Sequence, residues 1–157
     1  MSSVRLARDI PMAHTPPGGW HGEMPPPVLG DCDEPIADGI PDFRGTWQAF
    51  AVEEDGQPLD DLRHIERIEQ AGNRVVITSR PVIHDMYADG TLENGVNDVS
   101  GFDGQEIHVA AAFEDGRLVL RPGNMFIAVT RHLEGDVLVW SLLPLKRVTR
   151  MRRVGAA

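Results

Sequence analysis

The sequence predicts an all-β protein: an antiparallel up-and-down barrel of about eight to ten strands that follows an extended, proline-rich arm. Two observations predict this fold class. From Phe43 onward, short runs of valine, isoleucine, phenylalanine and tryptophan alternate with polar residues, and turns that contain glycine separate the runs. No stretch repeats its apolar residues every 3.6 positions, so helices are expected to be a minor component.

The first 41 residues differ from the rest of the chain in composition. They hold eight of the twelve prolines, including the runs at 16–17 and 25–27, and they show no hydrophobic period. This composition is typical of an extended arm with polyproline character. We therefore expect an arm at 1–41 and a barrel domain at 42–157. Trp20 is an apolar residue that could hold the arm against the barrel or against a second copy of the chain.

The predicted strands follow the arm as a meander, and closing a meander into a barrel removes both unpaired edges. A Greek-key sandwich would need long crossovers, whereas every connection after residue 64 looks short. One helical turn is expected from Gln57 to Arg63. The strands are placed at about 45–53, 64–70, 74–80, 82–88, 95–100, 106–113, 117–121, 125–133, 137–143 and 147–154.

Length, charge and cysteine content limit the kinds of function that we expect of this protein. The 157 residues suit one domain, and their net charge of −9 disfavours a nucleic-acid partner. The single cysteine, Cys32, excludes an intrachain disulfide and a metal site built on cysteine pairs. No apolar stretch is long enough to span a membrane, and no secretory signal is recognisable. We therefore expect a cytoplasmic protein.

The sequence contains none of the motifs that indicate a cofactor-binding or metal-binding site. The six histidines are never spaced like metal ligands, and there is no phosphate-binding loop, dinucleotide fingerprint or nucleophile elbow. We therefore expect no cofactor and no metal ion.

Two short stretches carry a resemblance to a known family. One is Phe43–Trp47, which reads Phe-Arg-Gly-Thr-Trp. The other is the C-terminal hairpin, in which Val129–Arg131 precedes a turn at Gly135 and the chain returns through Val148–Arg152. Together they resemble the calycin superfamily, meaning the lipocalins and especially the intracellular fatty-acid-binding proteins, over roughly residues 42–154. The resemblance implies a closed β-barrel that binds a small apolar or amphipathic, carboxylate-bearing ligand.

The resemblance also implies where the ligand carboxylate would be held. In that family two arginines and a tyrosine on the last strands hold it, and by position they fall on Arg131, Arg150 and Arg152. The third position departs from the pattern, because arginine stands where the family has tyrosine. The chain also departs from the family between its first two strands, where residues 53–63 leave no room for the usual helical lid.

Strand alternation gives an independent argument for these positions. Arg150 and Arg152 share one face of a strand, and Arg131 continues an apolar row. A buried arginine is costly unless a carboxylate pairs with it, and either a ligand or an acidic residue such as Asp85, Asp98 or Glu106 could do so. The candidate ligand-binding residues are Arg131, Arg150, Arg152, Met125, Ile127, Val129, Val139, Ser141 and Tyr87.

Two other functions stay open at this stage. The chain could be a barrel enzyme, such as an isomerase, cyclase or lyase, that acts on a small hydrophobic substrate through His84, Asp85, Tyr87 or His108. It could also be an interaction protein whose arm engages a partner, including a homodimer formed through the arm.

Overall fold

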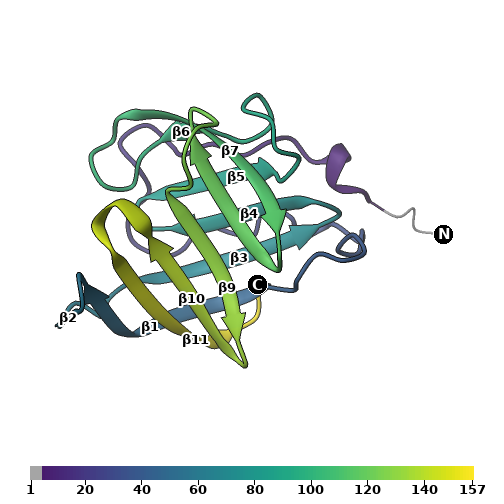
Figure 1. Ribbon diagram of the computed structural model, residues 1–157. Coiled ribbons are helices and arrows are strands. Elements are labelled where there is room, and N and C mark those ends of the chain that lie inside the picture. The colour runs from purple at the N-terminus through teal and green to yellow at the C-terminus, as the bar shows by residue number, and fades with distance from the viewer. Residues whose placement is uncertain (1–4) are drawn as a thin grey trace.

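The computed structural model describes residues 5–157 and shows an all-β, antiparallel barrel that is nearly closed (Figure 1). The predicted all-β class and antiparallel barrel are confirmed. The strands follow the order β5-β4-β3-β1-β11-β10-β9-β8-β7-β6, and β2 pairs with β1 outside this path. The elements are η1 (Ala7–Asp9), β1 (Gly45–Glu54), β2 (Gln57–Leu59), β3 (Ile65–Ala71), β4 (Arg74–Ser79), β5 (Val82–Tyr87), β6 (Val96–Val99), β7 (Glu106–Glu114), β8 (Arg117–Pro122), β9 (Val129–Glu134), β10 (Val137–Leu142), η2 (Leu143–Leu145) and β11 (Arg147–Gly155).

The barrel closes through its first and last strands and stays open at one seam. Strand β1 pairs with β3 on one side and with β11 on the other, whereas β5 and β6 end the ladder. His84 Nε2 donates a hydrogen bond across this seam to the carbonyl of Val99 at 2.8 Å. In Figure 1, strands β3, β4 and β5 cross behind β8, β9 and β10, so the two halves of the wall enclose an interior between them.

Two of the predicted elements are wrong. Residues 57–59 form strand β2 instead of a helical turn, because Asp55 and Gly56 adopt positive φ angles of 52° and 80° and turn the chain back onto β1. The strand expected at 125–133 begins only at Val129. Gly123 and Asn124, with φ of 60° and 56°, take up left-handed conformations that interrupt the extended chain.

One end of the barrel interior is completely filled. Phe43, Trp47, Ile68, Leu138 and Met151 are all fully buried there. The indole Nε1 of Trp47 donates to the carbonyl of Phe43 at 2.9 Å, so the ring is buried without an unpaired donor. This end is the packed core that stabilises the barrel.

Residues 5–41, the N-terminal segment, cover the outer face of β3, β4 and β5. Trp20 and Leu29 are buried against Val76 and Ile83 of this face. Beneath them Arg74 pairs with Asp85. These strands are therefore buried on both faces, in contrast to most antiparallel sheets.

None of the helices within residues 5–157 is long and apolar enough to cross a membrane.

Candidate functional site

The barrel interior holds a cavity of about 770 Å³ that opens at one end. Its mouth lies among the turns between β4 and β5, β6 and β7, β8 and β9, and β10 and β11, together with residues 60–64. The walls are mostly apolar, as in typical small-molecule sites. The apolar lining comes from Val52, Leu59, Ile65, Ile77, Val82, Met86, Val96, Phe102, Ile107, Val109, Leu120, Pro122, Ala128, Val129, Trp140 and Leu142.

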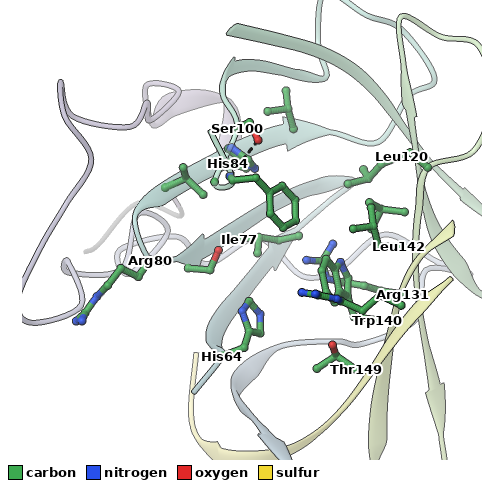
Figure 2. A pocket seen from close by; sticks show the side chains of 18 of the residues that line it. His64, Ile77, Arg80, His84, Ser100, Leu120, Arg131, Trp140, Leu142 and Thr149 are labelled. Atoms are coloured by element: carbon green, nitrogen blue, oxygen red, sulfur yellow. Dashed lines mark hydrogen bonds between the residues drawn. The ribbon is translucent and has the colours of Figure 1, made fainter. Parts of the chain in front are cut away.

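One group of polar residues, which we call the Glu66 cluster, interrupts the apolar wall. It consists of His64, Glu66, Arg131 and Trp140. Arg131 donates to Glu66 through Nε at 2.9 Å and through Nη2 at 3.2 Å, and Nε2 of His64 lies 2.7 Å from Glu66 Oε1. The imidazole of His64 stacks on Trp140 with ring centroids 5.8 Å apart, and the Arg131 guanidinium lies 6.0 Å from the same ring. Figure 2 shows His64, Arg131 and Trp140 in the lower half of the view, with His84 in the upper half.

Glu66 is fully buried, and its partners keep it ionised. Burial raises the pKa of Glu66, but Arg131 and His64 outweigh that effect and hold the pKa at about 2, compared with an ordinary value of 4.5. The carboxylate therefore accepts hydrogen bonds from both neighbours at neutral pH. In consequence His64 carries its proton on Nε2, the nitrogen that faces Glu66.

Arg131 has a donor that the protein does not use. Its side chain is only 7% exposed, and Nη1 has no hydrogen-bond partner in residues 5–157. Leaving a buried donor unpaired costs about 1–3 kcal/mol. A hydrogen-bond acceptor on a molecule inside the cavity would remove that penalty.

The second histidine of the cavity, His84, lies on β5. Burial lowers the pKa of His84, because the charged imidazolium is disfavoured away from water. His84 is therefore neutral, with the proton on the nitrogen that donates to Val99. Residues 5–157 contain no group of three histidine, cysteine, aspartate or glutamate side chains arranged to hold a metal ion.

The mouth is more basic than the protein as a whole. Four arginines line the cavity, against a single aspartate, although the chain has a net charge of −9. Arg80 links the mouth to the N-terminal segment, because it donates to the carbonyl of Gly22 and its guanidinium lies 5.2 Å from the centroid of the Trp20 ring. The five charged lining residues are Asp61, Arg63, Arg80, Arg131 and Arg147.

Exposed apolar side chains gather on the loops around the mouth. The two most exposed of them, Phe102 and Met125, are each 70% accessible. Phe102 also lines the cavity, so it lies at the passage between the interior and the solvent. The other exposed apolar residues of these loops are Leu62, Phe126, Leu143 and Leu145.

Of the basic residues predicted to bind a ligand, only Arg131 lines the cavity. The prediction that Arg150 and Arg152 face the interior is wrong. Arg150 pairs with Glu53 on the outer surface at 3.2 Å, and the Arg152 guanidinium lies 4.1 Å from the centroid of the Phe50 ring. The physical reason is that Met151, the large apolar residue between them, takes the inward position and is fully buried.

Of the predicted apolar contacts, Val129 lines the cavity and the others do not. Met125 and Ile127 belong to the loop before β9, so strand alternation does not apply to them. Val139 and Ser141 point away from the cavity, because the residues of β10 that alternate with them, Trp140 and Leu142, point inward. Tyr87 lies on the outer face, with its ring centroid 5.8 Å from the Arg74 guanidinium.

The four residues suggested for an enzyme do not converge on the cavity, and only His84 lines it. Asp85 is buried on the outer face, where it pairs with Arg74. His108 is exposed and contacts Asn97 and Glu106. An enzyme that combines these residues inside the barrel is therefore contradicted by their positions, because successive residues of a strand point to opposite faces.

Sequence reasoning missed His64, Glu66, Trp140 and Thr149, all of which belong to the cavity or its polar cluster. The sequence of β3 alone did not show that Glu66 faces the barrel interior. Both faces of strand β3 are buried, so apolar residues occur both at positions that point inward and at positions that point outward. Their pattern therefore does not show which side chains face the barrel interior. The acidic partner expected for Arg131 among Asp85, Asp98 and Glu106 is in fact Glu66.

A scan against protein-family models finds no match to this chain, and a search of curated proteins finds no similar sequence. What the cavity does is therefore argued from its geometry.

Proposed function

We propose that the barrel binds a small amphipathic molecule, with its apolar body in the cavity and a polar head at the Glu66 cluster. The observation that carries this proposal is a mostly apolar cavity of about 770 Å³ whose wall includes Arg131, a cation with one nitrogen, Nη1, that has no partner in residues 5–157. A carboxylate, carbonyl or hydroxyl oxygen would supply the missing acceptor. We place the chain in the calycin superfamily as part of this proposal, supported by the Phe43–Trp47 motif and by a ten-strand order that joins the first strand to the last.

The apolar walls supply most of the affinity in this proposal. Each methylene group moved from water into such a site contributes about 0.8 kcal/mol. The polar head adds orientation more than affinity, because Glu66 already balances the charge of Arg131. A carboxylate is nevertheless the preferred head, since Arg80 at the mouth has no acidic partner within residues 5–157, whereas Arg63 and Arg147 pair with Asp61 and Glu54.

A titration with fatty acids and aromatic carboxylates tests the proposal. Trp140 lines the cavity, so its fluorescence should change as the ligand enters. We expect saturable binding, and we expect the charge-neutral double variant Arg131→Met/Glu66→Leu to weaken carboxylate binding about tenfold or more. Removing both charges together keeps the site apolar and avoids an unpaired buried ion.

Failure of every tested fatty acid and aromatic carboxylate to bind would contradict the proposal. Equal affinity of the wild type and the double variant would leave the cavity as a binding site but remove the assigned role of Arg131.

A homodimer through the N-terminal segment and a cytoplasmic location stay predictions of the sequence. Trp20 and Leu29 are buried against the barrel of their own chain. Such a dimer would therefore have to use other residues of the segment.

A further inference from the structure

Two nitrogen atoms of the Glu66 cluster have no partner within residues 5–157: one is a hydrogen-bond donor and the other an acceptor. Arg131 Nη1 is a donor. His64 makes a hydrogen bond through Nε2 only, so its Nδ1 offers a free lone pair. His64 lines the cavity and its side chain is one-third exposed. The cluster thus combines a free acceptor on His64 and a buried free donor on Arg131, two residues that both line the cavity and both bind Glu66.

The contact with Glu66 suits His64 to accept a proton. When Nδ1 takes up a proton, the imidazolium that forms stays paired with the carboxylate 2.7 Å away. The stacked ring of Trp140, inclined by only 11°, restricts rotation of the imidazole. A base held in a fixed orientation is more effective than a mobile one.

The same carboxylate positions the donor. Glu66 binds Arg131 through both of its oxygens, at 2.9 and 3.2 Å, so the guanidinium plane is fixed relative to His64. A fixed cationic N–H group in a site shielded from water stabilises negative charge that develops on an oxygen. Carbonyl oxygen is the group that gains such charge when a neighbouring carbon loses a proton.

From this arrangement we propose that the Glu66 cluster catalyses proton transfer on a carbonyl compound, an inference that rests on the proposed binding of a small molecule in the cavity. His64 Nδ1 takes the proton from the carbon next to the carbonyl. The C–H bond breaks, its electrons form the enolate, and the cationic guanidinium of Arg131, which lines the cavity, stabilises the negative charge on the enolate oxygen. Return of the proton to the same carbon, or to the far end of a conjugated system, completes an exchange or an isomerisation without any other reactant.

Charge balance favours this reaction in an apolar site. The step starts from the neutral form of His64, beside anionic Glu66 and cationic Arg131. After it the imidazolium and the enolate are added as one cation and one anion, so the net charge of the site stays zero. The apolar walls select an apolar aldehyde or ketone in preference to a polyhydroxylated one.

The test is exchange of the α-protons of 2-tetralone, an apolar ketone, for deuterium, followed by proton NMR in D₂O with the full-length protein. General acid–base catalysis typically contributes about 10²–10⁴-fold, so we expect exchange in His64→Gln to be at least about 100 times slower than in the wild type. Added imidazole should restore exchange in His64→Ala, which a purely structural role of His64 would not allow.

His108→Gln is the matched control. His108 also pairs with a glutamate two residues away, at 3.0 Å from Glu106, but it lies exposed on the outside of the barrel. The control should exchange the ketone at the wild-type rate. Equal loss of exchange in His108→Gln and His64→Gln would overturn the inference.

Fluorescence of Trp140 reports whether 2-tetralone binds. Binding without exchange faster than in His64→Gln overturns the inference and leaves the proposed function intact. The same holds if carboxylates bind and the ketone does not. If neither carboxylates nor the ketone bind, the proposed function fails and the inference fails with it.

Discussion

Two of the buried arginine–carboxylate pairs, one on each face of the barrel wall, are satisfied to different degrees. Arg74 and Asp85 lie on the outer face, and both side chains are completely buried. Besides Asp85, Arg74 donates to the carbonyls of Ala7, Ile10 and Pro11 at 2.6–3.1 Å. Arg131 and Glu66 form the inner pair, in which Nη1 of Arg131 has no hydrogen-bond partner within residues 5–157.

The difference separates a structural pair from the pair that we propose to contact a ligand. Every donor nitrogen of Arg74 is used within residues 5–157, and its backbone partners all belong to the N-terminal segment, so this arginine holds the segment on the sheet. Arg131 lines the cavity, and its buried Nη1 has no third contact within residues 5–157. Buried polar groups are nearly always paired in native structures, and among those without a partner in residues 5–157 Arg131 Nη1 belongs to a residue that lines the cavity, which is why we propose Arg131 as a ligand contact.

The largest expected effect comes from breaking the outer pair. Arg74→Met leaves Asp85 as an uncompensated buried carboxylate and removes the contacts to the N-terminal segment. We expect the free energy of unfolding to fall by about 3–5 kcal/mol, measured by urea denaturation. Arg74→Met/Asp85→Leu should recover part of this loss, and a single variant as stable as the wild type would refute the structural role of the pair.

Acid unfolding should show the contribution of the inner pair. The pKa of Glu66 in the folded protein, about 2, lies below its ordinary value of 4.5, so its stabilisation is complete above about pH 4.5 and is lost as the pH falls toward 2. The shift corresponds to a contribution on the order of 3 kcal/mol. Urea denaturation at pH 2 to 6 should therefore show a weaker pH dependence in Arg131→Met/Glu66→Leu. Identical dependence in the two proteins would contradict the assigned state of Glu66.

The smallest effect is expected from a third arginine pair, on the surface. Arg150 and Glu53 are each about 40% exposed, and exposed ion pairs contribute about 0–1 kcal/mol. Arg150→Met should change the free energy of unfolding by about 0.5 kcal/mol or less. Its dissociation constant for any carboxylate that the cavity binds should equal that of the wild type. Loss of carboxylate affinity in this variant would indicate that the Arg150 side chain faces the cavity and contacts the ligand.

Strand alternation and turn composition were sufficient to predict the barrel and most of its strands. They failed where a local backbone conformation intervened, as at Gly123 and Asn124, whose left-handed residues delay the start of β9. Alternation also placed Arg131 correctly, because the apolar neighbour that shares its face, Val129, lines the cavity. It misplaced Arg150, because alternation shows which residues share a face without showing which face is the inner one.

By itself the sequence determined the all-β class, the meander and the inward position of Arg131, since all of these depend on residues near one another in the chain. Only the tertiary structure decided that Glu66 pairs with Arg131, a residue 65 positions away, and that His64 and Trp140 join them. The physical reason lies in how the strands pair. Strand β1 pairs with β11 through register shifts near Thr46 and Ala49, so the register of the strands cannot be read from the sequence. The N-terminal segment buries the outer face of β3, so the polarity of that strand does not show which of its side chains point into the barrel.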